Sequence, residues 1–383
     1  MTLEQTVTEW RHHLHQYPEF GTEEFKTSEF VANKLEEFGI EVHRGIGGTG
    51  VLGILKNGTS NRSIGLRADM DALRIHEENT LCYASKHNGA MHACGHDGHT
   101  AMLLGAAQEL ANSKQFDGTA YFIFQPDEER GTGAKAMIAD GLFTRWNMDA
   151  IYAMHNLPGI SAGKFVTRPS SLMASESSFE IVIKATGGHA AMPHMGTDPI
   201  VVGAQVVTAL QTIVSRNLSA IDETAVVSVT NFVTNGTVNV IPSQVTISGD
   251  TRSFTDQALH KIEKAIERVV AGQCMSAGVD YQYSFNNSFL STINAPEETD
   301  HAIKAAQAVV GVENVDGSCE RFTISEDFSF MLREVKGCYV LVGNGVGECG
   351  GTALHNPHYD FNDNILKHGV GFWKTLVEQQ LLL

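Results

Sequence analysis

Apolar segments of strand length alternate with amphipathic helical segments along the first 155 residues of the chain. The expected strands are 50–55, 63–68, 119–124 and 150–154, and the expected helices are 4–15, 23–38 and 100–112. Strands and helices that alternate in this way favour a mixed, mostly parallel sheet with helices on both faces. We therefore expect an α/β fold for this part of the chain.

Polar residues follow three of these strands directly. Asp69 and Asp71 come after the second strand, the run 125–130 comes after the third, and His155 closes the fourth. Open α/β sheets bind their ligands outside the carboxyl ends of the strands. This regular placement indicates a ligand site at that edge of the sheet.

The stretch from His92 to His99 contains three imidazoles, a thiol and a carboxylate among glycines and alanines. Cys94 and His96 lie two positions apart, so that in an extended or looped backbone their side chains can converge. A thiolate with an imidazole suits zinc and other divalent first-row metals. The alternative is a chance cluster in which Cys94 is a small buried apolar residue.

Two adjacent carboxylates, Glu128 and Glu129, follow the strand 119–124. A lone acidic pair is usually solvated, but adjacent loop residues point in different directions. One carboxylate can then bind a metal while the other takes a proton from a metal-bound water. His155 and His355 are further candidate ligands, although a single histidine is more often structural.

The pattern changes at about residue 176. From there to residue 288 the segments follow the order β-α-β-β-α-β, with expected helices at 199–216 and around 259–270. This order is typical of a ferredoxin-like α+β domain. We therefore predict an inserted domain over 176–288, and a discontinuous first domain formed by 1–175 and 289–383.

The composition limits the class of protein. A length of 383 residues suggests about two domains, and a net charge of -17 without a long basic run argues against nucleic acid or an anionic membrane as partner. No run approaches ~20 apolar residues, and no apolar leader is visible at the start. Six scattered cysteines indicate reduced thiols, so we expect a cytoplasmic protein.

Seven motifs in order resemble the M20 metallopeptidase and aminoacylase family. The resemblance covers essentially the whole chain and is strongest to the amidohydrolase branch with hippurate hydrolases, indole-acetyl-amino-acid hydrolases and N-acyl-amino-acid deacylases. The motifs are Arg67-Ala-Asp-Met-Asp-Ala-Leu, His92-Ala-Cys-Gly-His-Asp-Gly-His, Phe124-Gln-Pro-Asp-Glu-Glu, Gly187-Gly-His-Ala-Ala-Met-Pro-His, Asn239-Val-Ile-Pro, Ser325-Glu-Asp-Phe-Ser and Leu354-His-Asn-Pro.

The resemblance implies a site with two divalent metal ions per chain, Mn or Zn foremost, with Ni or Co as alternatives. Cys94 would bridge the two ions. Glu129 and His355 would complete the coordination of one ion, and His96 and His155 that of the other. Glu128 would be the general base. Many M20 peptidases have a bridging aspartate and a metal-binding histidine near position 67, and here Cys94 and His96 would take those two roles.

Three residues of the inserted domain are also implicated by the resemblance. His189 would reach a neighbouring active site across a homodimer and steady the tetrahedral oxyanion, so the inserted domain would act as lid and dimerisation domain. Asn239 and Arg252 would receive a substrate carboxylate, a group that matches the arginine fork. The alternatives are a turn histidine and an arginine in a surface ion pair.

The function implied is hydrolysis of an N-acyl-amino acid to a carboxylate and a free amino acid, by attack of a metal-bound hydroxide. A dipeptidase or metallo-carboxypeptidase acting on a short peptide is the close alternative. Rivals are a non-catalytic binding protein and an enzyme with Cys94 as nucleophile. Arg74, where the family usually has proline, and Thr186, where glycine is common, leave the substrate preference open.

Overall fold

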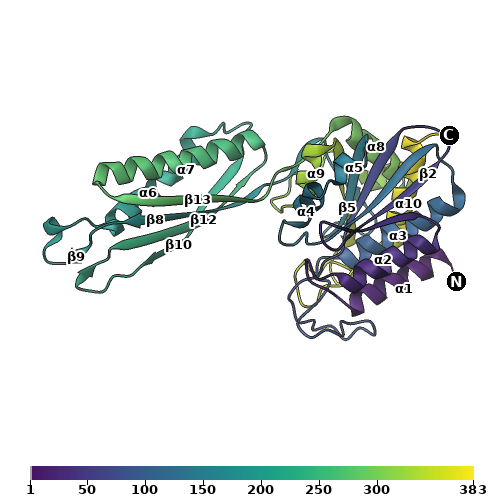
Figure 1. Ribbon diagram of the computed structural model, residues 1–383, viewed down its shortest axis with the longest axis horizontal. Helices are drawn as coiled ribbons and strands as arrows, with labels where there is room; N and C mark the ends of the chain where they lie inside the picture. The colour runs from purple at the N-terminus through teal and green to yellow at the C-terminus, as the bar shows by residue number, and fades with distance from the viewer. Residues whose placement is uncertain (1) are drawn as a thin grey trace. The chain divides into compact units, whose positions relative to one another are not determined.

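The computed structural model describes residues 2–383, and the chain divides into two compact units (Figure 1). Unit 1 contains the residues up to Leu172 together with 293–320 and 327–383, and unit 2 contains 173–292 and 321–326. The predicted inserted domain, 176–288, lies within unit 2. The short segment 321–326 was assigned to the first domain and belongs to unit 2 instead. It does so because Phe322 pairs with Met173 and Arg321 stacks on Phe254.

An eight-stranded sheet forms the centre of unit 1, in the order β1-β2-β4-β3-β5-β16-β6-β15. The strands are β1 (Glu41–Ile46), β2 (Gly50–Asn57), β4 (Gly118–Gln125), β3 (Ser63–Asp69), β5 (Ala150–Pro158), β16 (Gly337–Gly345), β6 (Phe165–Val166) and β15 (Val315–Asp316). The four central strands, β4, β3, β5 and β16, are mutually parallel. The expected α/β class with a mostly parallel central sheet is confirmed, although β1 was not anticipated.

Helices cover both faces of this sheet, and every residue of β3 and β16 is buried as a result. The helices of unit 1 are α1 (Leu3–Gln16), α2 (Phe25–Glu37), α3 (His96–Ser113), α4 (Gly133–Ala139), α5 (Leu142–Arg145), α8 (Pro296–Val310), α9 (Phe328–Glu334) and α10 (Leu366–Gln380). α3 packs on the sheet and against α1, α2 and α10, whereas α4 and α9 contact β4 and β5.

The start of α3 corrects one sequence expectation. The helix was predicted from residue 100, but it begins at His96, so His96 and His99 share its first turn. Gly95 permits this start because it takes the left-handed φ of 97° that a side chain disfavours. Gly98 allows the helix to approach Phe361, whose ring would lie 2.2 Å from an added Cβ.

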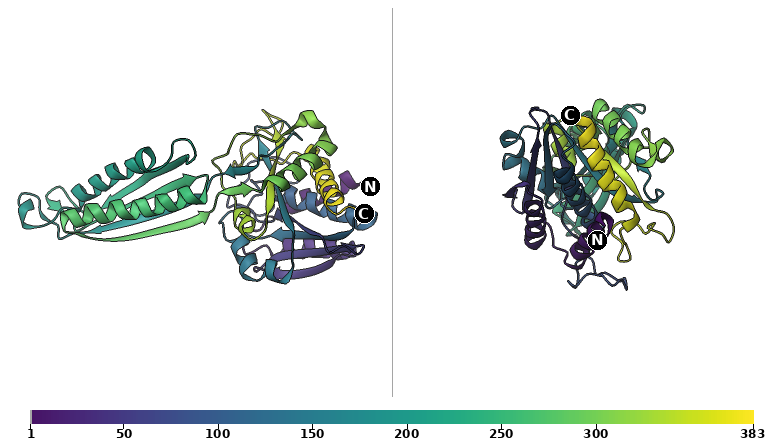
Figure 2. Two further views of the ribbon diagram at one scale, coloured as in Figure 1. Left: turned by 90° about the horizontal axis from the view of Figure 1, so that it is seen from above. Right: turned by 90° about the vertical axis from the view of Figure 1, so that its right-hand side faces the viewer.

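Unit 2 has the predicted β-α-β-β-α-β order. It consists of β8 (Glu176–Lys184), α6 (Pro199–Thr212), β10 (Ala225–Thr234), β12 (Gln244–Ser253), α7 (Asp256–Ala277) and β13 (Asp280–Phe289). The antiparallel sheet has the order β10-β12-β8-β13, and α6 and α7 lie side by side on one of its faces (Figure 2). A separate ribbon pairs β9 (Gly188–His189) with β11 (Val240–Ile241).

Helix α6 and the π-helical segment Ile213–Asn217 that follows it form one apolar segment, Pro199–Asn217, with a mean hydropathy of 1.2. By length and composition alone this segment could cross a membrane. No such helix was expected from the sequence. Only 33% of it is buried. One side packs into the core of unit 2 through Val202, Val206 and Leu210, while Ile200 and Val201 on the other side are exposed.

Candidate metal centre

The carboxyl edge of the parallel strands in unit 1 gathers acidic, imidazole and thiol side chains. Asp69 ends β3, the turn with Glu128 and Glu129 follows β4, and His155 lies within β5 rather than at its end. Cys94 precedes α3 directly, and His355 comes from the loop before α10. Parallel strands place these segments together because their carboxyl ends meet at one edge.

The structure brings the five predicted metal ligands together. The Cys94 sulfur lies 3.4 Å from Nε2 of His155. Oε1 of Glu129 lies 3.4 Å from Nε2 of His355 and 4.0 Å from Nε2 of His96. Each ligand is thus in contact with, or close to, at least one other.

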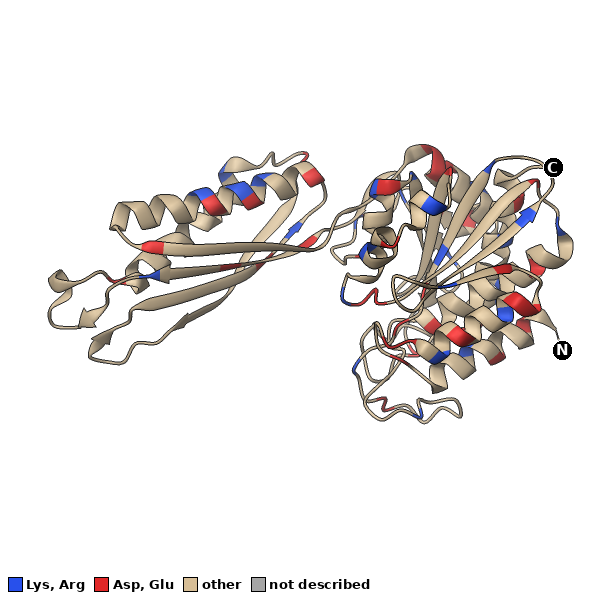
Figure 3. Ribbon diagram, in the orientation of Figure 1, with Lys and Arg blue, Asp and Glu red and all other residues tan. Residues whose placement is uncertain are grey.

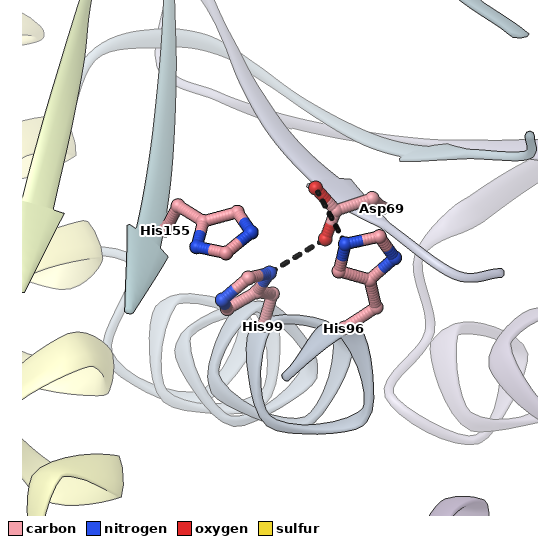
Figure 4. Close-up of side chains that lie close together, drawn as sticks. All are labelled: Asp69, His96, His99 and His155. Carbon is pink, nitrogen blue, oxygen red and sulfur yellow. Dashed lines mark hydrogen bonds and ion pairs between the residues drawn. The ribbon is translucent and has the colours of Figure 1, made fainter. Parts of the chain in front are cut away.

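Two overlapping groups have ligand atoms that all lie within 4.8 Å of one another. One consists of Cys94, His96 and Glu129, and the other of Asp69, His96, His99 and His155 (Figure 4). His96 belongs to both groups. The division of the ligands between two ions therefore stays a prediction, and both groups are compatible with a pair of neighbouring cations.

The donor atoms fit a divalent metal. Within residues 2–383, Nε2 of His96 and Oε1 of Glu129 are buried and have no hydrogen-bond partner, although Oε1 lies 3.4 Å from His355. Buried polar atoms in this state cost free energy unless something binds them. Five carboxylates lie in this region, and the Arg67 guanidinium pairs with two of them, Asp69 and Asp327. The other three are Asp71, Glu128 and Glu129. A surplus of buried negative charge with nitrogen and sulfur donors is what divalent cations neutralise.

The protonation of the site also depends on a cation. Burial, with the charges of Glu129 and Glu128, raises the pKa of the Cys94 thiol well above its usual value. Burial lowers the pKa of His96, but the charge of Asp69 and the hydrogen bond to Asp71 outweigh it and raise the pKa to about 10. Burial lowers the pKa of His155. A bound cation reverses this balance and favours the thiolate and the neutral imidazole.

Four buried residues of the site were not predicted as functional: Asp69, Asp71, His99 and Asn156. Nδ1 of His99 lies 2.6 Å from Asp69, and Nε2 lies 3.0 Å from the backbone nitrogen and 2.9 Å from the side-chain oxygen of Asn156. Both ring nitrogens of His99 are thus engaged by protein groups. His99 was overlooked because the expected helix began at residue 100. With α3 starting at His96, positions 96 and 99 lie on one face of the helix.

The turn after β4 is rigid around the two glutamates. Asp127 adopts a left-handed φ of 52°, and its carboxylate accepts hydrogen bonds from Arg130 and Thr132. Its backbone N–H donates to Glu24 over 2.9 Å. Glu128 is buried, with 6% of its surface exposed, so a carboxylate beside the ligand group is held away from bulk water.

Comparison with known proteins agrees with this geometry. The model of peptidase family M20/M25/M40 matches residues 65–379. The chain belongs to peptidase family M20. It is 39% identical to a hippurate hydrolase of Campylobacter jejuni over 371 residues, which cover 97% of this chain and 95% of that protein.

This M20 protein is also similar to a carboxypeptidase and to a peptidase of known structure. A thermostable carboxypeptidase of Saccharolobus solfataricus is 33% identical over 376 residues, 96% of this chain and 93% of that one. The crystal structure of a Bacillus subtilis dinuclear metal binding peptidase from the M20 family has a TM-score of 0.86 at 30% identity, and the match covers 99% of this chain and 98% of that one. The protein is therefore a metal-dependent amidohydrolase of the M20 family.

The two departures from the M20 pattern have structural roles. The Arg74 guanidinium lies 3.9 Å from the centre of the Phe20 ring. Thr186 and Thr197 exchange hydrogen bonds between their hydroxyls and backbone N–H groups, which closes the loop that carries His189. Neither residue contacts a predicted ligand.

The predicted residues of unit 2 separate into two places. His189 and Asn239 lie together in the exposed β9–β11 ribbon, where Val240 pairs with His189 and the Ala190 N–H donates to the Asn239 carbonyl. Arg252 lies on β12 and is already engaged: it pairs with Glu176 at 2.7 Å and with Asp250 at 3.0 Å. The structure thus does not bring Asn239 and Arg252 together within one chain.

A buried ionic group supports the first turn of α3 from behind. Nδ1 of His15 lies 2.8 Å from Asp97, the residue after His96, and Nε2 lies 3.3 Å from Glu77. Burial lowers the pKa of His15, but Asp97 and Glu77 outweigh it and raise the pKa to about 9. The imidazole is therefore charged at neutral pH.

We expect His15 to make stability depend on pH. Because its pKa is raised from 6.5, its contribution is complete below pH 6.5 and disappears as the pH rises through 9, with a magnitude on the order of 3 kcal/mol. Urea unfolding of metal-free protein is measured at pH 6 and at pH 9.5. Between these two pH values, the free energy of unfolding should fall more for wild type than for His15→Gln. The control is His13→Gln on the same helix, because burial lowers the pKa of His13. Equal losses in wild type and His15→Gln would contradict this assignment.

Proposed function

We propose that the protein hydrolyses N-acyl-amino acids to a carboxylate and a free amino acid, with two divalent ions, Mn or Zn foremost, held by Cys94, His96, Glu129, His155 and His355. The observation that carries this proposal is the convergence of these five side chains beside a buried Glu128. When bound, the ions would polarise the amide carbonyl and lower the pKa of the attacking water.

The residues of the chain then have distinct roles. The Glu128 carboxylate takes a proton from the attacking water and delivers it to the nitrogen of the leaving amine as the C–N bond breaks. Its burial keeps bulk water away from this transfer. Asp127 and its partners Arg130 and Thr132 hold the turn that carries Glu128 and Glu129. The free thiols of all six cysteines support a reducing compartment such as the cytoplasm.

Two alternatives fit less well. A carboxypeptidase or dipeptidase would use the same centre, and the relative from Saccharolobus solfataricus supports it, but it requires a partner for the additional charged groups of a peptide. A Cys94 nucleophile needs a thiolate with a basic histidine. Burial instead raises the pKa of Cys94 and lowers that of His155, its neighbour at 3.4 Å.

The proposed function is tested by one assay series. Purified protein is stripped with a chelator and incubated with N-benzoyl-, N-acetyl- and indole-acetyl-amino acids and with dipeptides. We expect no turnover in the stripped protein, and turnover of N-acyl-amino acids after addition of Mn, Zn, Co or Ni. Turnover of dipeptides alone would favour the peptidase, and a fully active protein without bound metal would contradict the proposal.

Substitution of Glu128 and of Glu129 should have different effects. We expect Glu128→Gln to keep both ions and to lose about 100- to 10,000-fold in kcat, the usual contribution of a general acid–base group. Glu129→Gln should instead weaken the binding of one metal ion, because Glu129 lies next to His96 and His355. Elemental analysis with kinetics on both variants checks this. Near-normal turnover of Glu128→Gln would rule out its role as base.

We further propose a homodimer formed through unit 2. His189 and Asn239 extend from the end of the sheet at which Lys184 pairs with Gln244. Arg252 lies eight residues beyond Gln244 along β12, about 27 Å away at ~3.4 Å per residue. One small substrate cannot contact both places within one chain, whereas two chains related by a two-fold axis can supply one each.

Strand β10 and helix α6 form the surface proposed for this dimer. β10 is an edge strand, and neither β10 nor α6 contains a charged residue (Figure 3). Val226 and Val233 on β10, with Ile200 and Val201 on α6, are exposed at 39–53%. An apolar strand edge with unpaired backbone groups favours association with a second copy.

We expect His189 to act across the dimer. His189→Ala should lower kcat about 100- to 1,000-fold, the usual effect of losing one oxyanion donor, with metal content unchanged. Refolding a 1:1 mixture of His189→Ala and Glu128→Gln chains should restore up to about a quarter of wild-type turnover, since half of the dimers then contain one intact site. An active monomer, or no recovery despite confirmed mixing, would rule out action in trans.

A further inference from the structure

Glu24 is a buried carboxylate directly before α2, and it contacts the turn that carries Glu128. Its Oε1 accepts the backbone N–H of Asp127 over 2.9 Å, and its Oε2 accepts the hydroxyl of Thr49 over 2.6 Å. Asp127 is the residue before Glu128, whereas Glu24 lies 103 residues earlier in the chain than Asp127. Glu24 therefore connects a distant segment to the turn after β4.

The backbone at Asp127 depends on such support. Its φ of 52° lies in the left-handed region, which is unfavourable for a residue with a side chain. A conformation of this kind persists where the surrounding structure holds it. The Asp127 carboxylate binds Arg130 and Thr132, which belong to the same part of the chain. These local bonds shape the turn, and the bond to Glu24 fixes it against the segment before α2.

The segment before α2 approaches the turn closely. A Cβ added to Gly21 would lie 1.8 Å from Oδ1 of Asp127, so a larger residue does not fit there. Arg130 also donates to the Gly21 carbonyl over 2.8 Å, but 59% of its side chain is exposed, and water competes for its donors. The buried bond between Glu24 and Asp127 is thus the stronger link.

The hydrogen bond, rather than the charge of Glu24, carries this link. Only 1% of Asp127 is exposed, and the N–H of a buried residue needs an acceptor. Burial raises the pKa of Glu24 to about 7, so its neutral form is also populated near pH 7. Both forms of the carboxyl group offer an oxygen to the Asp127 N–H.

We infer that Glu24 is a positioning residue that fixes the backbone at Asp127 and so places the Glu128 carboxylate for proton transfer. This inference rests on the proposed role of Glu128 as general base. Glu129 is held separately, because its backbone N–H donates to Asp71 over 3.1 Å. The loss of Glu24 should therefore lower kcat and leave metal binding unchanged.

The test compares two variants of the full chain, loaded with Mn and supplied with the N-acyl-amino acid that the wild type hydrolyses fastest. Glu24→Ala removes the acceptor, and kcat should fall about 10- to 100-fold, because a small misplacement of a catalytic group is costly. KM and the metal content should stay unchanged. Glu24→Gln keeps an oxygen for the Asp127 N–H and should restore kcat close to the wild-type value.

The matched control is Glu19→Ala in the same segment. The Glu19 carboxylate accepts the backbone N–H groups of Lys26 and Thr27 at the start of α2 and does not contact the turn. This variant should be less stable to urea but keep the wild-type kcat. Wild-type kcat in Glu24→Ala, an equal loss in Glu24→Gln, an equal loss in Glu19→Ala, or loss of metal from Glu24→Ala would each overturn the inference.

Hydrogen exchange measures the link without turnover and covers the case in which Glu24→Ala does not fold. Thr49→Val keeps the size of the side chain but removes the hydroxyl that holds Oε2 of Glu24. The turn 126–131 should exchange faster in Thr49→Val than in wild type, with α2 unchanged, and equal exchange of the turn would contradict the inference. If metal-loaded wild type hydrolyses no N-acyl-amino acid, the proposed function fails, and the exchange rates still decide whether Glu24 holds the turn.

Discussion

The metal centre depends on the hydrogen bonds that the buried guanidinium of Arg67 donates. It donates to Asp69 at the end of β3, to Gln125 at the end of β4, and to Asp327 just before α9. Three segments that are distant in sequence are thereby fixed at one edge of the sheet. Breaking a buried ion pair typically costs about 3–5 kcal/mol, because a charge is left without its partner. Arg67 and His99 engage the two oxygens of Asp69, and Oδ2 of Asp69 still lies 3.9 Å from Nε2 of His96.

The fold was predictable where the pattern of apolar residues is strong. The central strands of unit 1 and the ferredoxin-like order of unit 2 follow from periodicity alone, since each element has one or two faces to bury. The start of α3 was not predictable in this way, because Gly95 supplies a backbone conformation that hydrophobicity does not record. Segment 321–326 has no periodicity, and its place in unit 2 comes from long-range pairing with Met173 and Phe254.

The candidate site was predictable to the extent that its residues lie in recognisable motifs. Cys94, His96 and Glu129 were expected as ligands, and the structure places their donor atoms in one group. The supporting residues escaped prediction because their roles depend on hydrogen bonds between segments: Asp71 reaches both His96 and Glu129 only in the folded chain. Arg252 shows the opposite case, since the fold supplies two carboxylate partners that the sequence pattern could not reveal.

The environment of Cys94 has a consequence for how the centre is loaded and damaged. The sulfur is buried among carboxylates, so in the absence of a cation it keeps its proton. Metal uptake is then an exchange in which protons leave as cations enter, and the affinity must rise with pH. Because the thiolate rather than the thiol reacts with oxidants, the empty protein protects the sulfur on which its two ions would depend. Acidification or removal of metal would thus leave the sulfur protonated, and a later supply of metal would displace that proton.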